Sequence, residues 1–142
     1  MVSKIMFSKA LAKWVALVAE EKLGKDILIV DLTSIESAPA DFFVICSCDS
    51  DVQMRAIVDE IEIRCKKEHL PKPKVEGINS SYWVLLDFFD VVFHIFHHQA
   101  RKFYNLERLW SDGSFYKISQ SGRLVPVRNK TKLLAEFEQN GV

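Results

Sequence analysis

Apolar side chains near the start of the chain repeat with the period of an α-helix. The positions that share this spacing are Phe7, Leu11, Trp14, Val15 and Val18. They fall on one face, so the pattern predicts an amphipathic helix, and Gly24 is expected to end it. A second helix is predicted to begin at Ser50, because Ser50 and Gln53 have the spacing of a capping box and an apolar stripe follows them.

Short runs of β-branched and aromatic residues predict strands between the helices. These runs cover residues 26–32, 42–48, 74–77, 82–87 and 91–97. One further short helix is expected to end near Trp110. The resulting order, α-β-β-α-β-β-β-α, predicts an α/β fold in which a single mixed sheet of about five strands is flanked by helices.

The chain of 142 residues has the length of one domain. After Trp110 the sequence becomes polar and rich in Ser and Gly. Residues 1–110 are therefore interpreted as the domain and residues 111–142 as a variable C-terminal tail. Apolar residues near the end of that tail allow two interpretations, a short helix over residues 131–139 or disorder.

The charges of the chain balance overall but are unevenly spread. Basic and acidic residues number 19 each, whereas residues 26–69 contain ten acidic and four basic side chains. Zero net charge argues against a nucleic-acid binder that covers phosphates with one continuous basic face. An acidic middle segment instead favours a basic protein partner.

The sequence gives no sign of membrane insertion or secretion. No apolar run is long enough to span a bilayer, and Lys9 and Lys13 interrupt the first helix where a signal peptide would be apolar. The three cysteines, Cys46, Cys48 and Cys65, are an odd number and do not suggest a disulfide framework. A cytoplasmic protein without membrane contact is therefore expected.

Histidine and cysteine residues are weak candidates for metal chemistry. His94, His97 and His98 are close in sequence, but side chains alternate along a strand and no supporting ligand follows at a suitable spacing. Cys46 and Cys48 do not form a CxxC motif and suit the core. Neither a metal nor a cofactor is expected, and His94 is interpreted as a packed side chain.

Four carboxylates provide an enzymatic alternative. Asp49 and Asp51 lie at a strand-to-helix turn, and Asp87 and Asp90 flank a hairpin turn. Acids at strand ends are suited to holding Mg²⁺ for nucleotidyl or phosphoryl transfer. The turn before the second helix has no Gly to cradle a phosphate, and helix capping or turn formation explains each acid. A non-enzymatic role is therefore favoured over a transferase.

Large aromatic residues lie among acids in the second half of the chain. They are Trp83, Phe88, Phe89, Tyr104 and Trp110. Aromatic anchors with a polar rim are typical of protein-binding surfaces, and burial in the core is the alternative interpretation. Phe88 and Phe89 occupy positions where a two-residue hairpin turn favours Gly or Asn, so an exposed apolar tip is expected there.

Six separate blocks of the sequence match one known family with their spacing kept. The blocks are DFFVI at 41–45, SDVQMRAI at 50–57, VEG at 75–77, WVLLD at 83–87, DVVFHIF at 90–96 and ARKFYNLERLW at 100–110. Together they resemble the ribosomal silencing factor family (RsfS, also called Iojap-like). The resemblance covers about residues 8–110 and leaves out the tail.

The resemblance implies a fold similar to the nucleotidyltransferase fold, without an established enzymatic activity. It implies a repressor that binds the large ribosomal subunit through ribosomal protein uL-fourteen. The bound factor blocks the face where the small subunit docks, so that translation is repressed when nutrients are short. A homodimer is also expected, formed through an exposed sheet edge or the first helix. A general dimeric adaptor for another protein is a further alternative.

The family motifs assign partner binding to a specific set of residues. They are Glu76, Trp83, Asp87, Asp90, Tyr104, Glu107 and Arg108. By this assignment the two aromatic residues are apolar anchors, and Asp87, Asp90 and Glu107 pair with Lys or Arg of the partner. Arg108 either contacts the partner or forms a structural ion pair within the helix end. The sequence departs from the family at Phe89, where Gly is common, which leaves the shape of the hairpin tip open.

Overall fold

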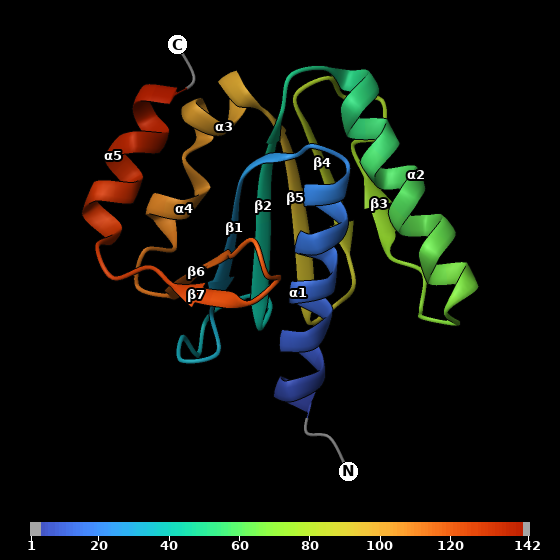
Figure 1. Ribbon diagram of the computed structural model, residues 1–142, viewed down its shortest axis with the longest axis horizontal. Helices are drawn as coiled ribbons and strands as arrows, with labels where there is room; N and C mark the ends of the chain where they lie inside the picture. Colours follow the sequence, from blue (N-terminus) through green and yellow to red (C-terminus); the bar gives the residue numbers. More distant parts are fainter. Residues whose placement is uncertain (1–3, 141–142) are drawn as a thin grey trace.

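The computed structural model describes residues 4–140, which form one mixed sheet flanked by helices (Figure 1). The elements are α1 (Lys4–Glu21), β1 (Lys25–Asp31), β2 (Phe42–Cys48), α2 (Asp51–Lys67), β3 (Lys74–Glu76), β4 (Trp83–Asp87), β5 (Val91–His97), α3 (His98–Tyr104), α4 (Leu106–Leu109), β6 (Ser114–Ile118), β7 (Leu124–Pro126) and α5 (Lys130–Asn140). The sheet has seven strands in the order β3-β4-β5-β2-β1-β6-β7, not the five expected. Similarity to the nucleotidyltransferase fold stays a prediction.

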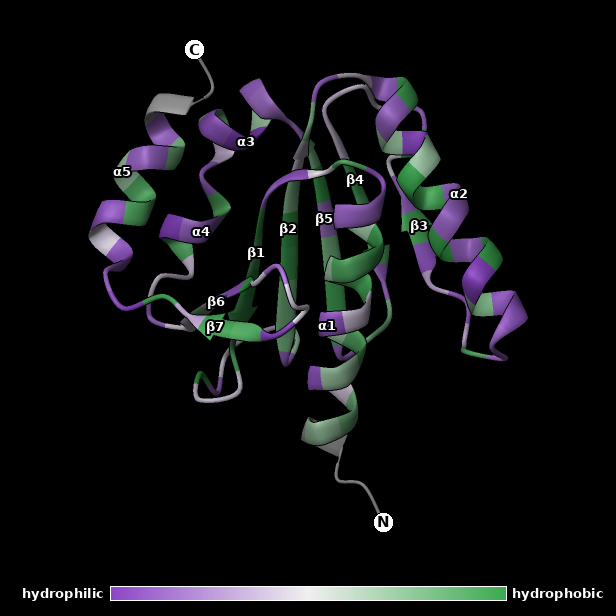
Figure 2. Ribbon diagram, in the orientation of Figure 1, coloured by the Kyte–Doolittle hydropathy of each residue, from purple (hydrophilic) through white to green (hydrophobic). Residues whose placement is uncertain are grey.

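The central strands are apolar on both faces because helices cover both faces. All seven residues of β2 are buried, and β2 runs parallel to β5, which places Val44 beside Phe93. Continuous apolar runs are typical of strands covered on both sides. Figure 2 shows β1, β2 and β5 mostly in the hydrophobic colour, whereas the helices carry both kinds of residue.

The helices form one layer on each side of the sheet. α1 and α2 cover one face, where Ile57 and Phe93 belong to a common core. α3, α4 and α5 lie on the other face, where Phe96 and Leu134 belong to a second core (Figure 1). The sheet therefore separates two hydrophobic layers, and each strand residue belongs to one of them by its alternation.

α1 packs on the sheet with a face slightly rotated from the predicted one. Val15 and Val18 are buried as expected, together with Ala12 and Ala16, whereas Phe7 is 50% exposed. Small side chains allow the helix to lie close to the sheet at the dense packing of protein interiors. Neither α1 nor any other helix in residues 4–140 has the length and apolar character needed to cross a membrane.

The residues after Trp110 extend the sheet rather than standing apart as a tail. β6 pairs antiparallel with β1, which brings Phe115 beside Val30, and β7 pairs with β6. The helix expected over residues 131–139 is present as α5 and buries Leu134. Ser and Gly in this segment belong to the turns around two short strands, so its composition concealed the strands.

Hydrogen bonds hold the turn between β4 and β5 in a conformation that glycine usually adopts. Phe89 has a φ of 77°, a conformation that bulky residues rarely adopt. The Asp87 carboxylate accepts the Phe89 N–H at 2.7 Å, and the Asp90 carbonyl accepts the Asp41 N–H at 2.8 Å. Phe89 is 80% exposed, which confirms an apolar tip, whereas Phe88 packs against the core.

Candidate protein-binding surface

The sheet face that carries α3, α4 and α5 is incompletely covered at the β3–β4 edge. On β4, Val84 and Leu86 are fully buried on the α1–α2 side, whereas Trp83 and Leu85 point the other way and are half-buried. Glu76 of β3 pairs with Leu85, so its side chain projects from the same face. We call this region, made by Glu76, Trp83, Leu85 and Tyr104, the open face.

A shallow cavity of about 350 Å³ lies on the open face. Its lining residues are Glu76, Gly77, Ser80, Tyr82, Trp83, Leu85 and Tyr104. Three of the residues assigned to partner binding from the sequence therefore meet at one cavity, although they come from β3, β4 and the end of α3. The cavity has an aromatic wall and an acidic edge.

Trp83 is held in place by neighbours from two elements. Its Nε1–H donates to Nδ1 of His94 at 3.2 Å. Its ring lies 4.8 Å from the Phe96 ring and 5.0 Å from the Tyr104 ring, between centroids. Contacts on several sides leave the indole few other rotamers, so the side chain is ordered before any partner arrives.

His94 is the residue that orients Trp83. It is buried on β5 directly opposite Leu85, and burial lowers its pKa from 6.5 to about 3. The imidazole is therefore neutral, with Nδ1 as the acceptor for Trp83. The sequence predicts a packed His94 but does not link it to Trp83. The two are diagonal neighbours on β4 and β5, which only the strand register shows.

Tyr104 extends the aromatic surface beyond the sheet. It ends α3, is 52% exposed, and meets Phe103 edge to face at 5.2 Å between ring centroids. Phe103 and Leu109 are also largely exposed. Exposed apolar side chains that lie in contact, as Phe103 and Tyr104 do, mark a site of interaction more often than a stable free surface.

The acids assigned to partner binding have different surroundings. Glu76 is exposed, and its carboxylate lies 3.5 Å from the ammonium of Lys74. Asp87 is half-buried and fixes the hairpin turn through the Phe89 N–H. Asp90 is half-buried too, and its carbonyl accepts backbone N–H groups from Asp41 and Phe42. Asp87 thus has a turn role besides any contact with a partner.

Glu107 lies inside the protein, so the expected contact with a partner's cation must be corrected. It is only 1% exposed and forms an ion pair at 3.1 Å with Arg101, which is also buried. Arg101 donates further bonds to the Asp26 carbonyl and the Ser47 hydroxyl. Asn105 adopts a left-handed conformation that separates α3 from α4, and this break turns Glu107 inward.

Arg108 forms a structural ion pair. Its Nε donates to Glu138 of α5 at 2.9 Å, and its terminal nitrogen bonds to the same carboxylate. Glu138 also accepts from Asn105. The guanidinium beside Glu138 lowers the pKa of that carboxyl group. Arg108 therefore ties α4 to α5, whereas the structural alternative expected from the sequence was an ion pair within its own helix end.

The carboxylates considered for metal-dependent transfer do not come together. Asp49 and Asp51 follow the end of β2, whereas Asp87 and Asp90 precede β5. Because β2 and β5 are parallel, the two pairs lie at opposite ends of the sheet. Asp49 pairs with Lys25 at 2.7 Å, whose hydrogen bond lowers its pKa, and Asp51 pairs with Arg55.

The histidine, cysteine and remaining acidic side chains also give no sign of a reactive site in the part of the chain that the structure describes. Within residues 4–140 no group of three or more His, Cys, Asp or Glu side chains is arranged to hold a metal ion. Cys46 and Cys48 are buried on β2, and the hydrogen bond between them, together with burial, raises the pKa of Cys46. A buried thiol with a raised pKa is a poor nucleophile.

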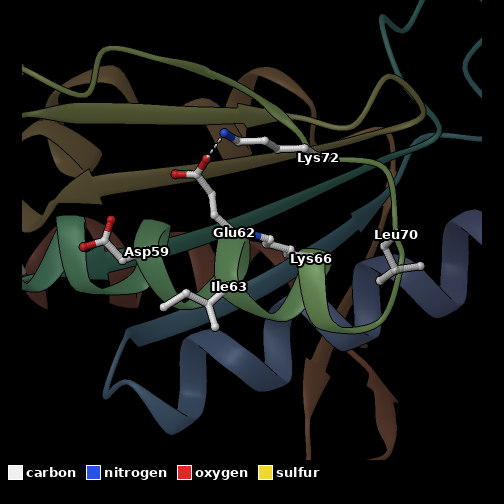
Figure 3. Close-up of a pocket in the computed structure, with 6 residues that line it drawn as sticks. All are labelled: Asp59, Glu62, Ile63, Lys66, Leu70 and Lys72. Atoms are coloured by element: carbon white, nitrogen blue, oxygen red, sulfur yellow. Dashed lines mark ion pairs between the residues drawn. The ribbon is translucent and has the colours of Figure 1, made fainter.

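A second hollow lies on the outer side of α2 (Figure 3). It measures about 530 Å³ and is lined by Asp59, Glu62, Ile63, Lys66, Leu70 and Lys72. Glu62 and Lys72 reach toward each other and form an ion pair at 3.1 Å. No sequence pattern indicates this groove, because it forms where the segment after α2 returns beside the helix.

The chain is similar to one described protein family, to curated proteins and to solved structures. It matches the family described as "Ribosomal silencing factor during starvation" over residues 6–139. It is 41% identical over 107 residues to the ribosomal silencing factor RsfS of Bacillus subtilis, covering 75% of this chain and 90% of that protein. A crystal structure of a Chromobacterium violaceum protein has a TM-score of 0.68 and 28% identity, covering 73% of this chain and 86% of its own.

A more distant relative has a name that refers to the large ribosomal subunit. The mouse protein "Mitochondrial assembly of ribosomal large subunit protein 1" is 30% identical over 106 residues. The matched region covers 71% of this chain and 45% of the mouse protein. The same domain therefore occurs within a longer polypeptide.

Proposed function

Because the chain belongs to the ribosomal silencing factor family, we propose that it represses translation by binding the large ribosomal subunit. In this proposal the open face contacts ribosomal protein uL-fourteen, and the bound chain occupies the surface on which the small subunit docks. Steric exclusion then prevents subunit joining, so the mechanism needs no catalytic group or cofactor. A repressor of this kind works where translation takes place, and the proposed location is the cytoplasm.

The preformed aromatic centre of the open face is the observation that carries this proposal. Trp83 is bonded to His94 and packed against Phe96 and Tyr104, so it loses little freedom when a partner covers it. Ordered aromatic side chains near the centre of an interface supply much of its binding energy. Trp83 and Tyr104 are therefore proposed as the two anchors.

Charge around the anchors supports a basic partner. Glu76 stands exposed at the cavity, and Asp87 and Asp90 lie at the hairpin end of the same strand pair. Complementary charge speeds encounter and fixes the orientation of a complex. The proposed contact therefore keeps Glu76, Asp87 and Asp90 as its acidic rim, and leaves Glu107 as an internal support.

The mouse relative supports the large subunit as the partner. Its name places it in the assembly of the ribosomal large subunit, and its similarity to this chain covers most of the domain. The proposed partner is thus a protein on the large subunit.

We also propose that the free chain forms a homodimer. Two exposed features are available for the contact: strand β3 at the edge of the sheet, and Met6 with Phe7 on α1. An unpaired strand edge is a template for pairing with a second copy. Sedimentation velocity over a range of protein concentrations measures this association directly.

Co-sedimentation with purified large and small ribosomal subunits tests the proposed function. We expect saturable pelleting with the large subunit alone, at low and at physiological salt. A subunit-joining assay should then show that the bound chain lowers the yield of joined ribosomes. No pelleting, or equal pelleting with both subunits that physiological salt abolishes, would overturn the proposed function and leave only the fold established.

A further inference from the structure

A group of basic residues on the α1 side of the molecule lies in two sequence segments that contain no acidic residue. Residues 5–19 and 113–126 contain no Asp or Glu. The two segments lie side by side, because Tyr116 of β6 and Leu124 of β7 pack against the same core as α1 (Figure 1). Their basic residues are thus concentrated rather than interleaved with acids.

Three of these cations line one shallow cavity of about 410 Å³. The lining residues are Met6, Lys9, Ala10, Lys13, Arg123 and Leu124. Lys9 and Lys13 are one helical turn apart on α1, and Arg123 reaches the cavity from the residue before β7. The cavity combines an apolar floor with three positive charges and contains no acid. We call Lys9, Lys13 and Arg123 the basic surface.

Several cations elsewhere in the chain are neutralised by acidic neighbours, unlike those of the basic surface. Lys22, Lys25, Arg55 and Arg64 all form ion pairs with carboxylates. Within residues 4–140, none of Lys9, Lys13 and Arg123 forms one. The ammonium of Lys9 instead lies 5.4 Å from the centre of the Tyr116 ring. Like charges brought together without a counterion repel, so an anionic partner would relieve the repulsion.

We propose that the basic surface binds the phosphate backbone of RNA without reading its sequence. Successive phosphates match cations spread along a helix and an adjoining strand, and the aromatic ring beneath Lys9 suits a neighbouring base or ribose. The balanced net charge of the chain is compatible with this role, because only a local surface is involved. The inference rests on the proposed function, since a ribosomal particle exposes RNA beside its proteins.

The basic surface and the open face lie on opposite sides of the sheet. Trp83 and Leu85 face the side of α3, whereas Lys9 and Lys13 belong to α1 on the other side. One ligand on each surface therefore leaves the other accessible. A protein contact and an RNA contact made together raise the overall affinity well above that of either contact.

Fluorescence anisotropy with a labelled single-stranded RNA of about ten nucleotides tests the proposal without ribosomes. The test variant combines Lys9→Gln, Lys13→Gln and Arg123→Gln. The matched control combines Lys66→Gln, Lys67→Gln and Lys102→Gln, which removes the same charge from exposed positions on α2 and α3. We expect roughly a tenfold or greater loss of affinity in the test variant. The slope of the logarithm of the binding constant against the logarithm of the salt concentration should also become shallower by about two. The control variant should keep most of its affinity.

Two results would overturn the proposal. One is wild-type protein that does not bind the RNA, and the other is an equal loss in the test and control variants, which would reflect net charge alone. Circular dichroism melting curves check that both variants fold. Trp83→Ala should bind the RNA as the wild type does, so a failure of the RNA contact is separable from a failure of large-subunit binding.

Discussion

The indole N–H of Trp83 donates to Nδ1 of His94 across the β4–β5 pair, at 3.2 Å. An imidazole nitrogen accepts only when it carries no proton, so the ring proton of the neutral histidine is on Nε2. Burial favours this neutral form. A half-buried tryptophan at a surface cavity is thereby oriented by an uncharged histidine in the layer beneath it.

Trp83→Ala is expected to weaken large-subunit binding by about 2 kcal/mol or more, roughly a 30-fold rise in the dissociation constant. Some loss of stability is expected, because the variant also removes ring contacts and the hydrogen bond to His94, but the protein should stay folded at the assay temperature. Quantitative co-sedimentation measures the binding. Trp110→Ala is the matched control, since Trp110 is also half-buried, packs against Phe43 and should lower stability to a similar extent without affecting binding. A Trp83→Ala protein that unfolds, or that binds normally, would identify Trp83 as a core residue.

His94 makes stability depend on pH in a defined direction. Its pKa is about 3 in the folded chain and near 6.5 when exposed, so between these values the unfolded chain binds the extra proton. The free energy of unfolding should therefore fall as pH falls below about 6.5, by roughly 1 kcal/mol for each pH unit once the unfolded histidine is charged. Urea titrations between about pH 7 and pH 4 measure the slope.

His94→Gln separates this effect from the titration of carboxyl groups. Glutamine offers an amide oxygen to the Trp83 N–H and carries no titratable group. The variant should lose the part of the acid-induced destabilisation that belongs to His94, so its slope between about pH 6 and pH 4 should be shallower than that of the wild type. Identical slopes in the two proteins would contradict a neutral, buried His94.

Glu107→Ala and Glu76→Ala should have opposite signatures. Removal of Glu107 leaves the Arg101 guanidinium buried and unpaired, which costs about 3 kcal/mol or more of unfolding free energy. Glu76 is exposed, so its removal should change stability by less than about 0.5 kcal/mol while weakening large-subunit binding. Urea midpoints and co-sedimentation measure the two quantities. A stable Glu107→Ala protein with impaired binding would restore Glu107 to the interface.

The central part of the fold could be predicted from local sequence because its signals are local. Residues 42–48 and 91–97 are apolar on both faces, and Ser50 with Gln53 marks a helix start that the structure reproduces. β7 spans three residues and β6 five, among polar turns, and the pairing of β6 with β1 joins segments far apart in the chain. Such pairing leaves no periodic signal within a short window.

The surroundings of single residues in the candidate site were also only partly predictable from the sequence. Family motifs brought Glu76, Trp83 and Tyr104 together, and the structure places all three at one cavity. The inward position of Glu107 depends on Asn105, whose φ of 49° interrupts the helix. The family motifs do not contain that information, so the resemblance assigned Glu107 to the interface although the side chain is buried.

Phe89→Gly should stabilise the chain, by about 1 kcal/mol, because it removes the cost of a bulky residue at positive φ and loses little packing. Phe88→Gly is its natural comparison, since Phe88 packs against the core and its loss should destabilise. Both are measured by urea unfolding. A Phe89→Gly protein less stable than the wild type would mean that the exposed ring contributes packing that outweighs the strain.

Phe115→Ala tests whether the chain after Trp110 belongs to the cooperative fold. Phe115 is buried beside Val30 of β1, so truncating it should cost about 3 kcal/mol or more, as for other buried aromatic residues. Val125→Ala, at a largely exposed position of the outermost strand, should cost less than about 1 kcal/mol. If residues 111–142 were an independent tail, neither substitution would move the urea midpoint of the main transition. A large shift of the urea midpoint for Phe115→Ala alone would show that β6 unfolds together with the rest of the sheet. The same pairing of β6 with β1 places the basic surface beside α1.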